Sequence, residues 1–192
     1  MGVRKIIKKG SKGFTLIEMI AAMVLVSILV PGISSILGGT LMNIALTQIA
    51  ILANMEADYA QRNFKKHIDG AQTFVTDCTT KILKYTDYSS TQYQYKFVDR
   101  TGENPISTLQ YSNDNGATFG ILLENVVGID ADTLGYRSKF VYRDKYYTDL
   151  GVSPTESEIR GVELIFYILR GESVYSYSTY AAVDQYQLDI WD

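Results

Sequence analysis

An apolar segment of membrane-spanning length near the amino terminus constrains this chain more than any other feature. From Phe14 to Met55 the sequence contains a single charged residue, Glu18. A transmembrane helix needs about 20 predominantly apolar residues, and this segment is longer than that. We therefore expect a membrane-spanning helix over about residues 14–41. A carboxylate at the centre of a bilayer costs roughly 2.5–3.5 kcal/mol, so we expect Glu18 either to have a function or to reach water at the membrane edge.

The charge distribution predicts which side of the membrane each end occupies. Five basic residues and no acidic residue precede Gly13, whereas the 192-residue chain as a whole has a net charge of -3. Basic flanks are retained on the cytoplasmic side, so we expect residues 1–13 in the cytoplasm and the acidic body outside. An acidic body also argues against nucleic-acid binding.

An ordinary secretory signal is the main alternative for this segment. Its cleavage site would lie near Ser34–Ser35, after a basic region and an apolar region. Glu18 lies where that apolar region should begin, and apolar residues continue well past Ser35. Both observations favour a retained membrane anchor.

The helical pattern continues beyond the membrane segment. Apolar residues recur three or four positions apart, which is the period of one helix face: Ala60, Phe64, Ile68, Ala71, Val75 and Cys78. The pattern predicts one helix from about Phe14 to about Lys81, within a helical region 14–85. Proline removes a helix hydrogen bond, so Pro31 and Gly32 are the expected helix break, where the helix bends or unwinds.

The remainder of the chain, residues 86–192, has the pattern of an antiparallel sheet. Short segments rich in Tyr, Phe, Val and Ile alternate with turn residues, and we expect strands at 93–98, 106–111, 118–125, 138–147, 160–169 and 173–183. Asn115-Gly116 is a typical hairpin turn. We expect an antiparallel meander whose apolar face is covered by the amphipathic half of the helix, giving an α+β fold.

The string "KGFTLIEMI" resembles the cleavage site of type IV prepilins and pseudopilins. It combines a short basic leader ending in Gly13, then Phe14, then Glu18, all before a membrane segment and a long helix. The resemblance implies a pilin-like fold and cleavage by prepilin peptidase between Gly13 and Phe14. It also implies N-methylation of Phe14 and an assembly salt bridge between Glu18 and the Phe14 amine of a neighbouring subunit.

A looser resemblance links the chain to J-type pseudopilins and W-type minor pilins. It rests on "QRNFKKHIDGAQTF", "ILLENVVGIDA" and "IRGVELIFYILRGESVYSYST". It implies a minor subunit at the tip or initiation end of a type IV pilus or pseudopilus. The implied partners are the prepilin peptidase, other pilin subunits and an inner-membrane assembly platform. The protein would lie in the cell membrane before assembly and in an extracellular or envelope-spanning filament afterwards.

Several alternatives stay open on the sequence alone. They are a major pilin, a type II secretion pseudopilin, and a signal-anchored surface protein that never polymerises. Pilus, secretion and competence filaments are not distinguished by these residues, and neither is a role in cell adhesion.

The sequence lacks the residues of a recognisable catalytic or cofactor site. His67 is the only histidine and Cys78 the only cysteine, so a His-based triad, a His/Cys metal site and an internal disulfide cannot be assembled. We expect no enzyme activity, no cofactor and no metal, with Cys78 as a buried thiol. Asp130 and Asp132 are a candidate for weak calcium binding, although a solvated turn is the more ordinary interpretation of "GIDADTLG".

Overall fold

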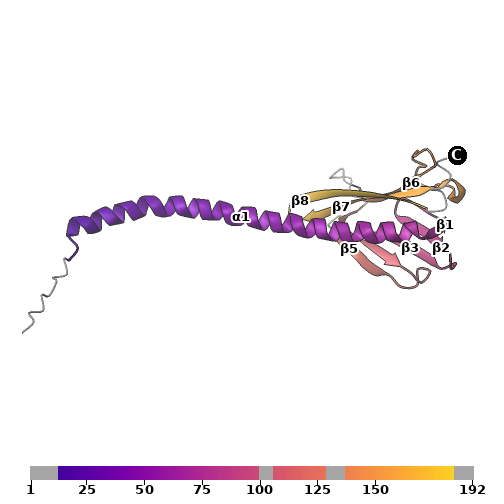
Figure 1. Cartoon of the computed structure of the whole chain (residues 1–192), viewed down its shortest axis with the longest axis horizontal. Helices are drawn as coiled ribbons and strands as arrows, with labels where there is room; N and C mark the ends of the chain where they lie inside the picture. Colours follow the sequence, from indigo (N-terminus) through magenta and orange to yellow (C-terminus); the bar gives the residue numbers. More distant parts are fainter. Residues whose placement is uncertain (1–12, 100–105, 129–136, 184–192) are drawn as a thin grey trace, which may run out of the picture. The chain divides into compact units, whose positions relative to one another are not determined.

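The computed structural model describes residues 13–99, 106–128 and 137–183, and it divides the chain into two compact units. The first unit ends at Gln48 and the second begins at Ile49. One helix, α1 (Leu16–Asp69), contributes to both units, and eight strands follow it in the second (Figure 1). This arrangement confirms the predicted α+β, pilin-like fold.

The two parts of α1 differ in the exposure of their side chains. Every residue from Gly13 to Gln48 is exposed. From Ile49 onward one face of the helix is buried, through residues spaced three or four positions apart: Ala53, Ala57, Ala60, Phe64 and Ile68. The small alanines allow close approach of the helix to its neighbours, and the larger Phe64 and Ile68 fill the core near its end.

The helix ends twelve residues earlier than the predicted end at Lys81, and this part of the prediction is wrong. Gly70 follows the last helical residue, and β1 (Ala71–Phe74) begins directly after it. Ala71 and Cys78 are buried as expected, but Ala71 lies in a strand and Cys78 in the bend between two strands. Residues in a strand and in the connection after it can be buried at the same spacing as residues on one face of a helix. The apolar periodicity therefore did not indicate where α1 ends. The structure therefore contains two strands that we did not predict, β1 and β2 (Ile82–Asp87).

The other six strands lie near their predicted positions. Their bounds are β3 (Gln92–Asp99), β4 (Ile106–Ser112), β5 (Gly120–Val127), β6 (Lys139–Arg143), β7 (Gly161–Arg170) and β8 (Ser173–Ala182). β6 is shorter than the expected 138–147, because Asp144 begins a turn. A short 3-10 helix, η1 (Glu156–Glu158), precedes β7.

The sheet is antiparallel throughout, but it is a simple meander only as far as β5. The strand order is β1-β2-β3-β4-β5-β7-β6, with β8 paired to β7. β8 pairs with β7 along its whole length. On the other edge of β7, β6 pairs with its first half, and β5 pairs with it at Ile168, opposite Val126. The predicted meander is thus corrected at β6, which pairs with β7 and not with β5.

The sheet curves until its β6 end meets the segment before β2. The Phe140 amide donates to the Thr80 carbonyl at 2.9 Å, and the Tyr142 hydroxyl donates to the carbonyls of Thr79 and Ile82 at 2.9 and 2.8 Å. The end of α1 lies inside this curve, with β7 and β8 on one side and β3 and β5 on the other (Figure 1). The Phe64 ring contacts Tyr95 of β3 and Phe140 of β6, with centroids 5.6 and 6.3 Å apart.

Three turns of the sheet share the pattern Asp-x-x-x-Thr. In each, the threonine amide donates to a side-chain oxygen of the aspartate: Thr91 to Asp87, Thr118 to Asp114, and Thr148 to Asp144. These hydrogen bonds stabilise the charged carboxylates. At Asp114, the hydroxyl of Ser112, the hydroxyl of Thr118 and the Thr118 amide all donate to the carboxylate and lower its pKa to about 2. The predicted hairpin turn at Asn115-Gly116 lies in the second of these turns, with φ of 61° and 80°.

Candidate functional site

Gly13 and Phe14 lie in exposed, non-helical backbone just before α1. The Phe14 side chain is 80% exposed. Apart from Gly13 and its two chain neighbours, no described residue has an atom within 4 Å of the position that a Cβ on Gly13 would occupy. Among the described residues, the peptide bond between Gly13 and Phe14 is therefore accessible to a macromolecule that approaches the backbone.

Thr15 and Glu18 form a capping box at the start of α1. The Thr15 amide and hydroxyl donate to Glu18 Oε2 at 2.9 and 2.8 Å, and the Glu18 amide donates to Thr15 Oγ1 at 3.4 Å. This reciprocal arrangement satisfies backbone amides that have no partner within the helix. The sequence signal was present as Thr-x-x-Glu before an apolar run, but we did not use it when predicting the role of Glu18.

The capping box leaves part of the Glu18 carboxylate available. Both hydrogen bonds from Thr15 reach Oε2, and no described residue donates to Oε1. The carboxylate also lies in the first turn of the helix, where the helix dipole favours a negative charge. Glu18 can therefore cap its own helix and still accept a cation from another molecule.

The segment that follows has the surface expected of a helix in lipid. Its large apolar side chains are about half or more exposed around the whole helix, from Leu16 at 80% to Leu46 at 48%. Three of its hydroxyl groups donate to carbonyls of the same helix: Ser27 to Val24, Thr40 to Ile36, and Thr47 to Asn43. Internal satisfaction of polar groups is a requirement in the membrane interior. By length and composition α1 is able to cross a membrane.

Pro31 and Gly32 lie within the continuous helix. α1 is assigned as helical on both sides of Pro31 and through it. The structure therefore shows no unwound segment at these residues, and the bend that we expected there stays a prediction.

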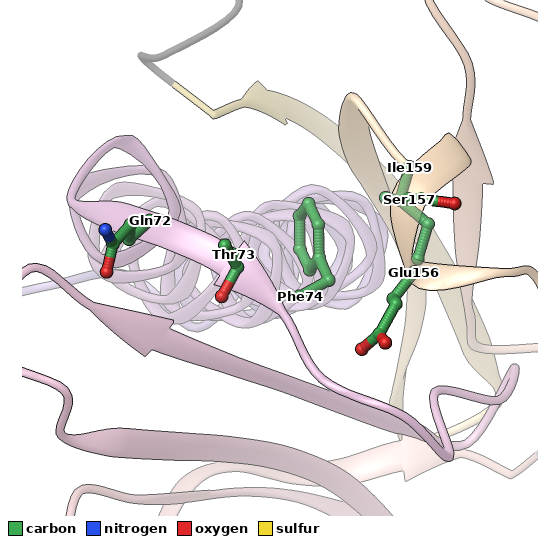
Figure 2. A pocket seen from close by; sticks show the side chains of 6 residues that line it. All are labelled: Gln72, Thr73, Phe74, Glu156, Ser157 and Ile159. Atoms are coloured by element: carbon green, nitrogen blue, oxygen red, sulfur yellow. The ribbon is translucent and has the colours of Figure 1, made fainter.

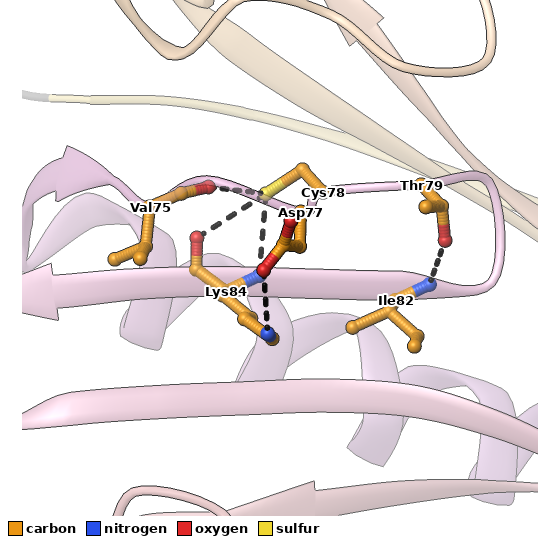
Figure 3. A network of polar contacts seen from close by, with 6 residues as sticks. All are labelled: Val75, Asp77, Cys78, Thr79, Ile82 and Lys84. Atoms are coloured by element: carbon orange, nitrogen blue, oxygen red, sulfur yellow. Dashed lines mark hydrogen bonds and ion pairs between the residues drawn. The ribbon is translucent and has the colours of Figure 1, made fainter.

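The second unit holds the remaining candidate residues. The Cys78 thiol is 3% exposed and donates to the carbonyls of Val75 and Lys84 at 3.2 and 3.4 Å, while the Lys84 amide donates to the sulfur (Figure 3). Burial raises the pKa of Cys78, so the thiol stays protonated and packs in the bend before β2. Among the described residues no group of three or more His, Cys, Asp or Glu side chains is placed to hold a metal ion. Asp130 and Asp132 lie outside the described residues.

His67 connects the last turn of α1 to the sheet. Its ring stacks on Tyr111 at 4.6 Å between centroids, and its Nδ1 lies 2.6 Å from the Tyr95 hydroxyl. Burial of Tyr95 raises the pKa of that hydroxyl, which therefore remains a donor. His67 thus accepts at Nδ1 in its neutral form, a structural role that the sequence did not predict.

Comparison with known proteins gives one match, and it falls on the amino-terminal segment. Residues 8–30 match the family described as the prokaryotic N-terminal methylation motif. This range includes Gly13, Phe14 and Glu18, together with the first half of the apolar segment. Searches of curated proteins and of solved structures found no match.

Proposed function

We propose that this chain, whose methylation motif at residues 8–30 supports the type IV prepilin and pseudopilin family, is a minor structural subunit of a type IV pilus or related pseudopilus. The observation that carries the proposal is the exposed Gly13–Phe14 bond directly before a capped helix of lipid-facing character. A prepilin peptidase cuts after Gly13 and methylates the new amine of Phe14. The apolar segment stays on the chain, first as a membrane anchor and then as the part that packs against other subunits on the assembly platform.

Intact-mass measurement of the membrane-derived protein tests the cleavage. We expect a chain that begins at Phe14. Its mass should exceed that of unmodified residues 14–192 by the amount that results when a methyl group replaces one hydrogen of the amine. Gly13→Phe should leave the precursor uncut, because a bulky side chain keeps the backbone from the catalytic groups. Gly10→Phe is the matched control within the leader and should be processed normally. A mature terminus beyond Ser34 would show that the segment is an ordinary signal sequence.

Glu18 has two candidate roles, and a pair of substitutions separates them. Glu18→Gln removes the charge but retains a side chain that can complete the capping box. Thr15→Ala removes the two hydrogen bonds of the capping box that involve the Thr15 hydroxyl and keeps the charge of Glu18. If Glu18 pairs with the Phe14 amine of a neighbouring subunit, removing the charge of Glu18 leaves that charged amine without a partner. Glu18→Gln should then be inserted and cleaved but lost from sheared filaments, while Thr15→Ala is incorporated.

The reverse pattern would contradict the pairing role. If Thr15→Ala is lost from filaments and Glu18→Gln is incorporated, capping of α1 is the role of Glu18. If the wild-type chain is absent from sheared filaments while it accumulates in the membrane, the chain is a surface anchor and not a filament subunit.

A further inference from the structure

β8 has an edge that no described strand covers. It pairs with β7 on one side and with no other described strand on the opposite side. The other two outer strands are shorter and have neighbours at their edges. η1 lies beside β1, as Figure 2 shows for Phe74 and Ser157, and β6 bonds through the Phe140 amide to the Thr80 carbonyl.

The backbone groups of alternate β8 residues point out from this edge. The Val183 amide donates to the Arg160 carbonyl at 3.2 Å, and hydrogen-bonded pairs recur at every second residue of an antiparallel ladder. The odd-numbered residues of β8 therefore bond to β7, and the even-numbered ones face away from it. The Ser178 carbonyl accepts from Gln61 of α1 at 2.9 Å. The amides and carbonyls of the next even-numbered residues, at positions 180 and 182, have no partner among the described residues.

β8 also lacks the features that protect the outer strands of natural sheets. Such strands are kept from pairing with other chains by charged side chains, proline, bulges or short length. β8 has ten residues, none of them charged and none of them proline, and it pairs with β7 without a register shift. A segment that covers this edge is therefore expected.

Residues 184–192 follow β8 almost directly, and their sequence has the pattern of a strand. They lie outside the described residues. Tyr186, Leu188 and Ile190 alternate with polar residues, which is the period of a half-buried strand. Asp184 is a residue type that favours turns. Nine extended residues span about 30 Å, so this segment is long enough to reverse direction and run back along the second half of β8.

The side of β8 that faces α1 offers an apolar neighbour to such a strand. The Tyr177 ring stacks on Phe166 with centroids 5.4 Å apart, and its hydroxyl donates to Asn54 of α1 at 2.8 Å. The odd-numbered side chains of β8 therefore face α1. Tyr177 is only partly buried, so an apolar side chain on an added strand would cover surface that the described residues leave exposed.

We propose that residues 186–190 pair antiparallel with the free edge of β8 and place Tyr186, Leu188 and Ile190 on the side that faces α1. Paired residues of neighbouring strands share a face, so these three lie opposite odd-numbered residues of β8. Gln187 and Asp189 then lie opposite the even-numbered residues, whose backbone groups point outward, whatever register the turn sets. The proposal goes beyond the filament function and does not depend on it.

Hydrogen exchange of individual amides, followed by NMR on the full-length protein in detergent micelles, tests the pairing. The amides of Gln187 and Asp189 should exchange slowly, because they bond to β8. The amides of Leu188 and Ile190 should exchange fast, because they point to the new outer edge. This alternation is specific to the proposed face and needs no variant.

Truncation after Val183 measures the effect on β8 itself. The Tyr180 amide should exchange about three- to tenfold faster in the truncated chain, the range expected for the loss of an ordinary hydrogen bond. The Val174 amide is the internal control, because seven residues that run back from a turn at Asp184 and Gln185 do not reach it. Its exchange should be unchanged.

A matched pair of substitutions keeps the test independent of truncation. Leu188→Asp places a charge on the side that faces α1, where burial disfavours it, and should speed exchange at Tyr180 as truncation does. Gln187→Asp introduces the same charge on the opposite side and should leave that exchange slow.

Four outcomes would overturn the proposal. The first is equal exchange of the Tyr180 amide in the full-length and truncated chains. The second is a lack of alternation across residues 187–190, or the opposite alternation. The third is equal loss of protection in Leu188→Asp and Gln187→Asp. The fourth is protection that increases with protein concentration, which would assign the edge to a second copy of the chain.

Discussion

His67 joins the end of α1 to the aromatic side chains of β3 and β4, and its protonation state affects that contact. The neutral ring accepts from the Tyr95 hydroxyl, for which the described residues offer no other acceptor. A protonated ring would donate at Nδ1 and leave the proton of that hydroxyl without a partner in the core. Burial, and secondarily the charge of Lys66, lower the pKa of His67 below its ordinary value of 6.5.

The lowered pKa predicts that acid destabilises the second unit. The unfolded chain binds the His67 proton more readily than the folded chain, so stability rises with pH across the interval between the two pKa values. The contribution of His67 is complete above pH 6.5 and is lost as the pH falls from 6.5 through the lower folded pKa. We therefore expect the Tm, measured by near-UV circular dichroism in micelles, to fall between pH 7.5 and pH 5.

His67→Gln is the matched control for this titration. The glutamine amide oxygen can accept from Tyr95 but carries no titrating proton, so the fall in Tm should be smaller in the variant. The carboxylates titrate in both proteins, and the difference between them isolates His67. An equal or larger fall in His67→Gln would show that the contact does not govern acid stability.

At the scale of elements, the contact between α1 and the sheet depends on a few large side chains. Phe64 is fully buried and contacts rings on both β3 and β6. Removal of a buried aromatic ring costs about 3–5 kcal/mol, through lost transfer energy and the cavity that remains. We expect Phe64→Ala to lower the free energy of unfolding of the second unit by that amount, as measured by urea denaturation in micelles.

Lys65→Ala provides the control in the same helical turn. Lys65 is exposed, and surface substitutions usually change stability by less than about 0.5 kcal/mol. Similar losses in the two variants would contradict the packing role of Phe64, because both substitutions introduce alanine, the residue with the highest helix propensity.

The strands were more predictable than the end of the helix, for a physical reason. Alternating aromatic and β-branched residues bounded by turn residues identify β3, β4, β5, β7 and β8, because a half-buried strand requires that pattern. Ala71 and Cys78 satisfy a helical spacing equally well in a strand and a bend, so periodicity alone could not locate the boundary at Gly70. The pairing of β6 with β7 joins residues that are distant in sequence, such as Phe140 and Leu164, and a local sequence pattern does not identify such partners.

The candidate site was predictable to different degrees in its two parts. Gly13, Phe14 and Glu18 were identified from a local string, and the motif match at residues 8–30 covers the same positions. The capping box between Thr15 and Glu18 follows from a four-residue pattern that we had not applied. The contacts of His67 arise from residues of separate elements, and only the folded structure brings them together.

At the scale of the whole molecule, the remaining question is how many copies a filament contains. A major subunit repeats the same heterologous contacts along the filament, which favours a body with few projecting connections. Here the connection between β6 and β7 is long and exposed: Tyr146 is 75% and Val152 is 65% exposed. If every subunit of a filament carried this connection, it would collide with adjacent subunits. A low-copy subunit at the tip lacks an adjacent subunit on one side and avoids this collision.

We therefore expect this chain to be a small fraction of purified filaments and to act when assembly starts. Deleting its gene should reduce the number of filaments per cell more than their length, because initiation and elongation are separate steps. Quantitative mass spectrometry of sheared filaments, with electron microscopy of filament number and length, measures both.

A matched strain that carries the Gly13→Phe precursor should resemble the deletion, since an uncut precursor cannot enter the filament. If this chain is the most abundant subunit, or if deletion shortens filaments without reducing their number, the minor-subunit proposal is wrong, and the pilin assignment itself is unaffected.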